Sequence, residues 1–303
     1  MPRHPFRERV GTAFAHYGGG DEKRMQAPLE TTSPSSAEPV LETGPETRRF
    51  YEELLDDLER EKIPFLVGGT FALYRYTGIG RVTKDLDLFL RFRDVPRLRV
   101  LEARGYEIEQ YAPHWLYKVR RDGEFADLVF SSANGVARVD ETWFIHARHG
   151  RILGRQVAIC PPEETLWSKA FIMERERYDG ADVIHLLLAT AEQLDWDRLL
   201  ERFDDDWRVL LSHLILFGYV YPGRRDSIPK WVLADLLERF WKEMGSHREP
   251  EPGPEICRGT LLSASQFVSD LEAGLRDARL SPDGGLLPEE IQTWTEALAE
   301  NDD

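Results

Sequence analysis

Residues 65–90 read FLVGGTFALYRYTGIGRVTKDLDLFL, and this stretch decides the expected fold. An apolar run leads into Gly68 and Gly69, and the segment that follows is apolar at helical spacing and ends at another pair of glycines. A second apolar run, DLDLFL, then contains Asp85 and Asp87. The pattern predicts a buried strand, a turn without side chains, a helix and a second strand.

The two aspartates of the second strand are expected to share one face. Residues two apart on a strand point to the same side, so Asp85 and Asp87 lie opposite Leu86 and Leu88. Aspartate is depleted in strands, and two like charges side by side repel unless a cation lies between them. The pair therefore predicts a ligand set for a divalent metal ion.

The glycine pair predicts a separate function, which is phosphate binding. Without Cβ atoms, Gly68 and Gly69 let the backbone approach a phosphate and donate N–H groups to its oxygens. The helix that is expected to begin at Thr70 adds its positive N-terminal end. Arg81 and Lys84, between the helix and the aspartates, are candidates for contacts with the phosphate tail.

This pattern resembles the signature of the DNA-polymerase-β-like nucleotidyltransferase superfamily. The signature is an apolar residue, Gly-Gly, a spacer and then Asp-apolar-Asp-apolar. The signature stands here as VGGT (67–70) and DLDL (85–88), with a spacer of 15 residues that is similar to that of AbiEii-type toxins. The resemblance implies a third carboxylate on a neighbouring strand. Asp127 in FADLVF matches that position.

A later segment, PPEETLWSKAFIMERERYDGADVIHLL (161–187), resembles the helical block that follows the sheet in the AbiEii-type proteins. The resemblance spans residues 50–195, and it implies that Lys169 contacts the triphosphate. The matching residues of the block are Lys169, Arg175 or Arg177, and Asp179 or Asp182.

The chemistry that the resemblance implies is nucleotidyl transfer from an NTP, such as ATP, to an acceptor hydroxyl. Asp85, Asp87 and Asp127 would hold two Mg²⁺ ions about 4 Å apart. RNA ends or protein side chains are acceptors in toxin-like members, and a small partner protein is a further expectation. Two alternatives stay open: transfer to a small molecule, as in aminoglycoside-modifying relatives, and a nucleotide- or partner-binding module without turnover.

Charge and composition limit the other classes of function. The net charge of -15 argues against a general nucleic-acid coat, although residues 60–160 carry 17 Lys and Arg against 12 Asp and Glu. A basic rim over residues 91–121 offers a place for an RNA end. Two cysteines in 303 residues favour a reducing cytoplasm, and no apolar run approaches the roughly 18 residues of a membrane span.

The expected class is α+β, with a small mixed sheet, flanking helices and a mostly helical C-terminal half. The expected parts are a disordered leader (1–45), a nucleotidyltransferase-fold domain (46–160), a helical domain (161–245), and a loop, helix and acidic tail (246–303). In the sheet domain we expect helices over 46–63 and 94–105, a hairpin of 115–121 with 124–130, and a strand over 151–160.

The C-terminal half is expected to be helical with a tryptophan-rich core. Helical periodicity predicts a helix from Pro162 to Leu194 and further helices beyond it. Residues 263–280 predict another helix with Ser263 as N-cap. Four tryptophans lie at intervals on the expected helices and are interpreted as core residues: Trp196, Trp207, Trp231 and Trp241.

Overall fold

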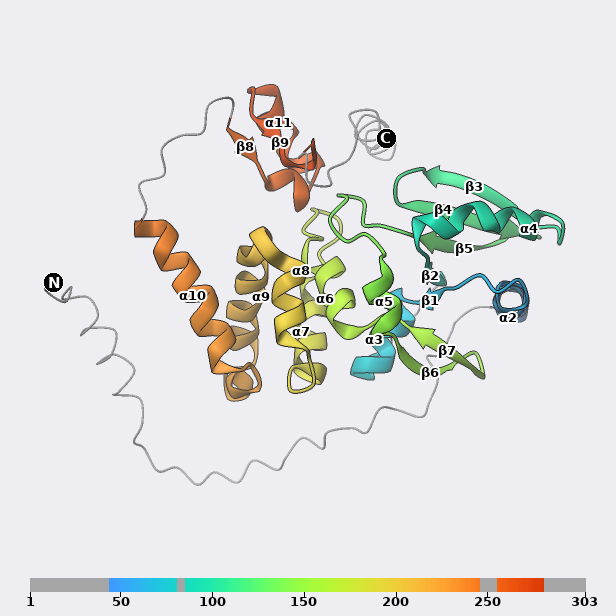
Figure 1. The fold of residues 1–303 in the computed structure, drawn as a ribbon, viewed down its shortest axis with the longest axis horizontal. Helices are drawn as coiled ribbons and strands as arrows, with labels where there is room; N and C mark the ends of the chain where they lie inside the picture. The colour runs from blue at the N-terminus through green and yellow to red at the C-terminus, as the bar shows by residue number, and fades with distance from the viewer. Residues whose placement is uncertain (1–43, 81–84, 246–254, 281–303) are drawn as a thin grey trace, which may run out of the picture. The chain divides into compact units, whose positions relative to one another are not determined.

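The computed structural model describes residues 44–80, 85–245 and 255–280, and seven of the described strands form one mixed sheet (Figure 1). Its strands are β1 (Leu66–Val67), β2 (Asp87–Phe89), β3 (Glu107–Ala112), β4 (Leu116–Arg121), β5 (Glu124–Val129), β6 (Arg148–Ile152) and β7 (Arg155–Ile159). They run in the order β3-β4-β5-β2-β1-β7-β6. A parallel pair, β8 (Ile256–Cys257) with β9 (Arg276–Asp277), forms a separate two-stranded sheet.

Helices follow and flank the sheet, so the α+β class is confirmed. They are α2 (Pro45–Arg60), α3 (Gly69–Thr77), α4 (Arg99–Glu102), α5 (Glu141–Ile145), α6 (Pro162–Ala170), α7 (Gly180–Thr190), α8 (Trp196–Phe203), α9 (Trp207–Val220), α10 (Lys230–Gly245) and α11 (Val268–Glu272). Short 3₁₀ helices are η1 (Phe92–Leu98), η2 (Asp204–Asp206), η3 (Pro222–Ser227), η4 (Gly259–Leu261), η5 (Ser265–Phe267) and η6 (Ala278–Leu280). Among the described residues, no helix combines the length and apolarity needed to cross a bilayer.

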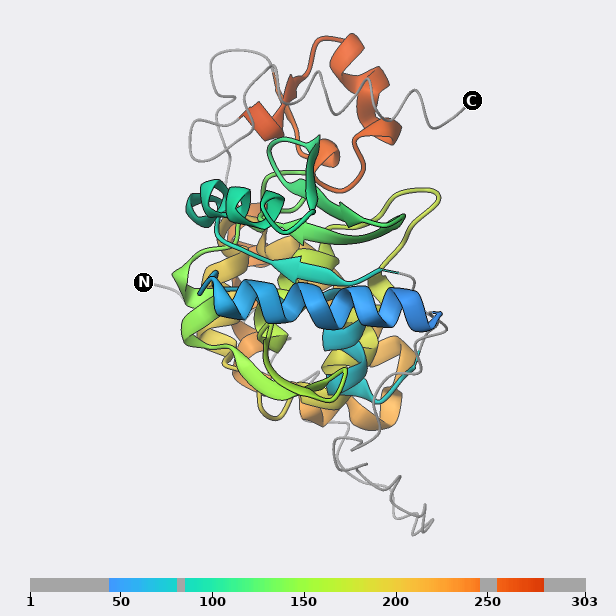
Figure 2. The same cartoon turned by 90° about the vertical axis from the view of Figure 1, so that its right-hand side faces the viewer.

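The pleat of the central strands sends side chains into two cores. Leu88 of β2 and Leu128 of β5 point to the core that α2 covers, and Figure 2 shows α2 lying lengthwise in front of the sheet. On the other side, Leu73 of α3 packs into a core that it shares with Leu187 of α7 and Phe217 of α9. The second core therefore connects the sheet region with the C-terminal helices.

The expected hairpin of β4 and β5 is confirmed. Asp122 and Gly123 have φ of 54° and 86°, which are the values a type I′ turn requires. Arg121 pairs with Glu124, and the antiparallel register continues without a shift to Leu116 and Val129.

The expected single strand over 151–160 is wrong, because the segment forms part of a second hairpin. Leu153 and Gly154 have φ of 52° and 75°, so the chain turns between β6 and β7. Strand β3, at the edge of the sheet, had no counterpart in the expectation. The expected helix over 94–105 is instead η1 followed by the short α4, with Pro96 inside η1.

The expected continuous helix from Pro162 to Leu194 is also wrong. Helix α6 ends at Ala170 and α7 begins at Gly180. Between them the Met173 N–H donates to Leu262 O at 3.2 Å, and the Asp179 N–H donates to Ile172 O at 3.1 Å. These bonds take the backbone groups that a continuous helix would use.

The helix expected over 263–280 is reduced to η5 and the five residues of α11. Gly274, with φ of 99°, turns the chain into β9. The Gln266 N–H donates to Ser263 Oγ at 3.3 Å, in the manner of an N-cap. The leader up to residue 43 and the tail from residue 281 lie outside the described residues.

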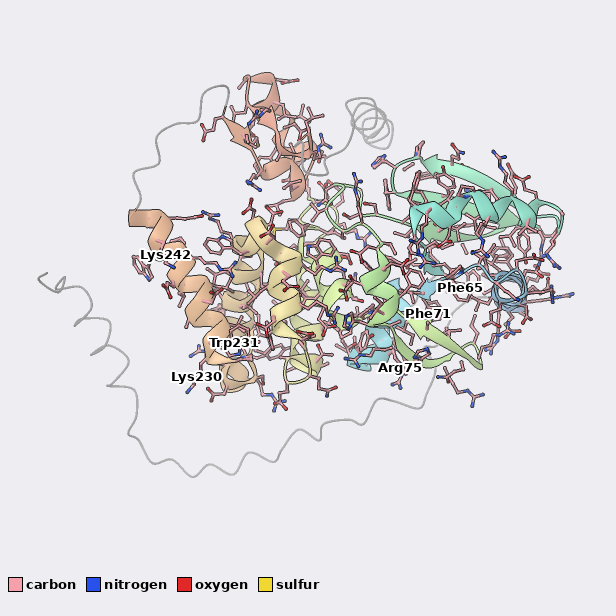
Figure 3. All side chains as sticks on the ribbon, viewed as in Figure 1. Phe65, Phe71, Arg75, Lys230, Trp231 and Lys242 are labelled. Carbon is pink, nitrogen blue, oxygen red and sulfur yellow. The ribbon has the colours of Figure 1, made fainter. Side chains whose placement is uncertain are left out.

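The interpretation of four core tryptophans is half wrong. Trp196 and Trp207 are buried, but Trp231 and Trp241 on α10 are 47% and 58% exposed. Helix α10 buries only Val232 and Leu236 fully. Figure 3 marks Lys230, Trp231 and Lys242 along this outer helix.

Candidate active site

The site begins where β1 ends. Val67 is followed by Gly68, whose N–H donates to Asp87 O at 2.9 Å and joins β1 to the start of β2. Gly68 is the N-cap of α3, and no side chain caps that helix end. Thr70 lies partly buried in the first turn of α3. The expected order of strand, glycine turn and helix is confirmed, with the helix beginning one residue earlier, at Gly69.

Gly69 allows the carboxylate of Asp87 to lie directly against the turn. Gly69 has φ of 54°, in the left-handed region that favours glycine. A Cβ on Gly69 would overlap Asp87 Oδ2. A Cβ on Gly68 would overlap the ring of Phe89. Both glycines are therefore required by what lies against them.

Asp87 and Asp127 are direct neighbours. They are paired in register across the parallel strands β2 and β5, where Cα atoms lie about 4.8 Å apart. Paired residues of adjacent strands point to the same face, so both carboxylates lie opposite the side that carries Leu88 and Leu128. Asp85 precedes β2, and its charge raises the pKa of both Asp87 and Asp127.

Burial and neighbouring carboxylates raise the pKa of both aspartates. Burial, and then the charge of Asp127, raise the pKa of Asp87 to about 6, while Lys169 and Arg177 oppose the shift. Burial also raises the pKa of Asp127 against the effect of Lys118. Two carboxylates in this state gain energy from any cation that lies between them.

Lys118 on β4 is a site residue that the sequence reasoning missed. Its Nζ donates to Asp127 Oδ1 at 2.8 Å and lies over the rings of Phe125 and Tyr111, at 4.5 and 4.9 Å from their centroids. The expected turn at Asp122-Gly123 contains the signal that could have found it. A two-residue turn fixes the register, and that register sets Lys118 opposite Asp127.

The charged residues predicted in the segment 161–187 also lie together in the structure. Lys169 Nζ donates to Asp179 Oδ2 at 2.7 Å and to Asp182 Oδ2 at 2.9 Å. Arg177 donates to both oxygens of Asp179, at 3.2 and 3.0 Å, and these partners lower the pKa of Asp179 against its burial. Lys169 is thus already paired, although it lines the same cavity as Asp87.

Tyr51 of α2 is a further neighbour of the carboxylates. It is fully buried, and burial followed by the charges of Asp85, Glu124, Asp87 and Asp127 raises the pKa of its hydroxyl. Arg81 and Lys84, the predicted phosphate contacts, lie outside the described residues.

The chemistry of the donor set fits a hard divalent cation, although the described side chains do not form a complete cage. Carboxylate oxygens are the ligands that Mg²⁺ prefers in proteins. In the described part of the chain, no group of three or more His, Cys, Asp or Glu residues is gathered closely enough to hold a metal ion. The ammonium group of Lys118 lies against one oxygen of Asp127, a position that a bound metal ion would otherwise take.

A cavity of about 300 Å³ opens beside Asp87. Gly68, Gly69 and Asp87 form part of its wall, α6 contributes Lys169, and the segment 260–264 contributes four more residues. Aromatic and aliphatic side chains predominate in the lining: Phe89, Trp115, Val129, Trp143, Phe171, Ile172, Leu261 and Leu262. The site can therefore place a small, mostly apolar molecule next to a carboxylate.

No family model matches the chain, and no curated protein matches it. Among solved structures, the chain is similar to the lincosamide antibiotic adenylyltransferase LnuA with lincomycin bound, with 19% identity, a TM-score of 0.35, and 48% of this chain and 98% of that chain covered. The antibiotic-resistance factor ANT(2″)-Ia gives 16% identity, a TM-score of 0.37, and coverage of 55% and 95%.

An antigenic nucleotidyltransferase-like protein from Paracoccidioides brasiliensis gives 17% identity, a TM-score of 0.38, and coverage of 63% and 94%. Nucleotidyltransferases and proteins like them are thus among the structures that the chain resembles. At these low TM-scores and identities, the likeness decides neither the family nor the activity.

Proposed function

We propose that the chain is a cytoplasmic, Mg²⁺-dependent nucleotidyltransferase that moves a nucleotide from an NTP, ATP among them, to an acceptor hydroxyl. One observation carries the proposal: Asp87 lies in register beside Asp127, on one face of the sheet, with its carboxylate against Gly69. Partly buried like charges cost free energy, and a role as ligands of one cation site explains why the two carboxylates are adjacent.

In the proposed site, Asp85, Asp87 and Asp127 hold the divalent cations. A bound Mg²⁺ supplies charge neutralisation on the phosphates and a lowered pKa of the acceptor hydroxyl. The carboxylate of Asp87 lies against Gly69 at the N-terminus of α3, so a cation held by Asp87 would meet a phosphate beside this turn. Positioning and charge are most of what the protein contributes in phosphoryl-type transfer.

Asp127 is the candidate acceptor of the hydroxyl proton. Lys118 donates to its Oδ1, which leaves Oδ2 as the oxygen that takes the proton. The raised pKa of Asp127 makes it a better base than an exposed aspartate. Lys118 then holds the carboxylate in its orientation, and Lys169 lies at the cavity wall, where Asp179 and Asp182 pair with it.

The acceptor defines two candidate forms of this function. The resemblance to AbiEii-type toxins favours an RNA end or a protein side chain, with a small partner protein in a toxin-like role. The apolar cavity beside Asp87 favours a small hydroxyl compound instead. The cavity is a feature of the described residues, and this second candidate rests on it.

The test is transfer of label from each α-labelled NTP in the presence of Mg²⁺, with total RNA, with a protein extract and with a panel of small hydroxyl compounds. We expect label on one acceptor class for the wild-type chain. Asp87→Asn should reduce transfer by about 10² or more, because the charge that holds the cation is removed while the shape is kept.

The matched control is Asp122→Asn, because Asp122 lies in the turn between β4 and β5 with its side chain 94% exposed. Asp122→Asn should transfer label like the wild type. Equal transfer by the Asp87 variant would refute the site. Nucleotide binding without transfer to any acceptor would support the binding module without turnover.

A further inference from the structure

The C-terminal segment contributes a buried arginine, Arg279, to the wall of the cavity. One of its N–H groups lacks a hydrogen-bond partner among the described residues. Arg279 of η6 lines the cavity and is 2% exposed. Its Nε and Nη2 donate to Asp277, with Nη2 at 2.7 Å from Oδ2. Its Nη1 has no hydrogen-bond partner among the described residues. A buried N–H group without a partner costs free energy, which a ligand atom would recover.

The arginine is held in a fixed orientation. Asp277 also accepts from Thr260 Oγ1 at 2.8 Å and from the Arg279 N–H at 2.9 Å, and these contacts lower its pKa against burial. Strand pairing of β8 with β9 fixes Asp277 beside Cys257. The donor at Nη1 is therefore preorganised and does not need to be ordered on binding.

A second polar atom of the lining lacks a partner. Ser131 follows β5 by two positions, is 5% exposed, and lines the same cavity. In the described part of the structure its Oγ makes no hydrogen bond. Two such groups in one mostly apolar cavity indicate a polar subsite rather than a packing defect.

The charge around this subsite decides which atom it takes. The cations of the lining are all paired: Lys169 with Asp179 and Asp182, Arg177 with Asp179, and Arg279 with Asp277. The side chains around Arg279 are therefore poorly suited to a triphosphate, which needs several uncompensated positive charges and which the proposed function places at the cations of Asp87. A single oxygen acceptor satisfies Arg279 Nη1 without a full counter-charge.

We infer that the cavity takes a small, mostly apolar acyl compound, whose carbonyl or carboxylate oxygen is bound by Arg279 Nη1 and Ser131 Oγ. The inference rests on the proposed function in one respect: the accepting hydroxyl of this compound is placed at the Asp87 end of the same cavity. The apolar side chains bury the body of the molecule, and the arginine selects its acyl group.

Binding to the full chain, without metal or nucleotide, tests this directly. The probes are 2-naphthamide, 2-naphthoate and 2-methylnaphthalene, which share one apolar body, and the measurement is isothermal titration calorimetry. We expect at least one acyl probe to bind about tenfold more tightly than the hydrocarbon. Comparison of the amide with the acid separates a carbonyl from a carboxylate ligand. Equal Kd values for all three probes would overturn the inference.

Variants locate the effect. Arg279→Lys keeps a charge beside Asp277 but removes Nη1, and Ser131→Ala removes the second group with little change in volume. Each should lower the preference for the acyl probe by about three- to tenfold and leave hydrocarbon binding unchanged. The control is Arg258→Lys, in the same segment, since Arg258 is 57% exposed and bonds Asp206 at 3.0 Å.

The two proposals fail separately. An acyl preference that depends on Arg279, without any nucleotide transfer, would support the acyl subsite and refute the proposed enzymatic function. Nucleotide transfer by the wild type, together with an acyl preference that is unchanged in folded Arg279→Lys and Ser131→Ala, would support the enzymatic function and refute the acyl subsite.

Discussion

Gly69 and Asp87 are the two residues whose contact most constrains the site. The carboxylate of Asp87 occupies the volume in which a side chain at position 69 would begin. Gly69 also has φ of 54°, so a substitution there meets both a strained backbone and a displaced carboxylate. Gly78, the C-cap of α3 with φ of 68°, has the same kind of backbone but nothing within 4 Å of an added Cβ.

This contrast predicts the effect of two alanine substitutions. Gly78→Ala should cost about 1 kcal/mol, the strain of a left-handed alanine alone. Gly69→Ala should cost about 2 kcal/mol more, because Asp87 has to move as well. Urea unfolding of the metal-free variants measures both values. Equal losses at the two positions would contradict the close contact between Gly69 and Asp87.

The pKa of Asp87 predicts a dependence of stability on pH in metal-free protein. Burial and Asp127 raise this pKa to about 6 in the folded chain, from about 3.9 in the unfolded chain. The folded state then binds the proton more tightly, so its stability falls as pH rises from about 4 through about 6. The loss is complete above that range and reaches at most about 3 kcal/mol.

Asp87→Asn lacks this titration, and the difference between the variant and the wild type isolates it. The quantity to measure is the free energy of unfolding in urea with a chelator present. Between pH 4.5 and pH 7.5, this free energy should rise by about 1–3 kcal/mol for the variant relative to the wild type. A difference that is the same at both pH values, or that has the opposite sign, would contradict the burial of a charged Asp87 beside Asp127.

The sequence could predict some site residues because local chemistry specifies them. Gly68, Gly69 and Asp87 follow from an apolar run, a turn and a strand within one short stretch. Lys118 was missed, although the two-residue turn of the hairpin implies its register. Arg279 had no signal, because its role depends on Asp277 and on a cavity between distant segments.

The connection between α6 and α7 is the element on which the C-terminal side of the site depends. Lys169 at the end of α6 bonds Asp179 and Asp182 at the start of α7, and the three side chains are 13%, 10% and 4% exposed. Acids at the N-terminus of a helix interact favourably with its dipole, and here they also hold a buried cation. The segment between the helices is tied to the C-terminal segment by Glu174, which accepts hydrogen bonds from Ser263 and Ser265.

Removing the lysine should therefore be costly. Lys169→Met removes the cation that the buried carboxylates of Asp179 and Asp182 share, and we expect a loss of about 3 kcal/mol of stability at pH 7. Lys242→Met on α10 is the control, because Lys242 pairs with Glu238 at a surface where both side chains are about 70% exposed, and it should cost less than about 0.5 kcal/mol. Thermal and urea unfolding give both values, and similar losses would contradict the ion cluster.

Prediction at the level of elements succeeded where pattern and turn chemistry agreed. Helices α2 and α3 and the hairpin of β4 and β5 have apolar periodicity bounded by glycines or a turn pair. Prediction failed where tertiary bonds override periodicity. The segment 171–179 reads as helix, but it pairs its backbone with Leu262 and with itself, and residues 276–277 pair with β8 instead of continuing α11.

The described chain unfolds as one body in this account, because one of its two apolar cores contains residues of the sheet and of the C-terminal helices. Leu66 of β1 and Leu73 of α3 belong to the same cluster as Leu187 of α7 and Phe217 of α9. Arg198 of α8 bonds Glu163 and Glu164 of α6, all of them buried, and this links two further helices. The expected domain boundary at residue 160 stays a prediction, and apolar packing connects residues on both sides of it.

Leu187→Ala tests this joint core. Leu187 is fully buried, so the substitution should cost about 2–5 kcal/mol. Native-state hydrogen exchange should show the same loss of protection for amides of β2 and β5 as for those of α7 and α9. Protection that falls only in the helices would show that the sheet folds independently of them.

The central claim is that the carboxylates of β2 and β5 bind a divalent cation together with a nucleotide. Mn²⁺ titration by electron paramagnetic resonance, with a non-hydrolysable NTP present, tests it without any knowledge of the acceptor. The account predicts that Mn²⁺ binds the wild type and Asp122→Asn equally, and binds Asp87→Asn at least tenfold more weakly. Equal binding by all three proteins would contradict it.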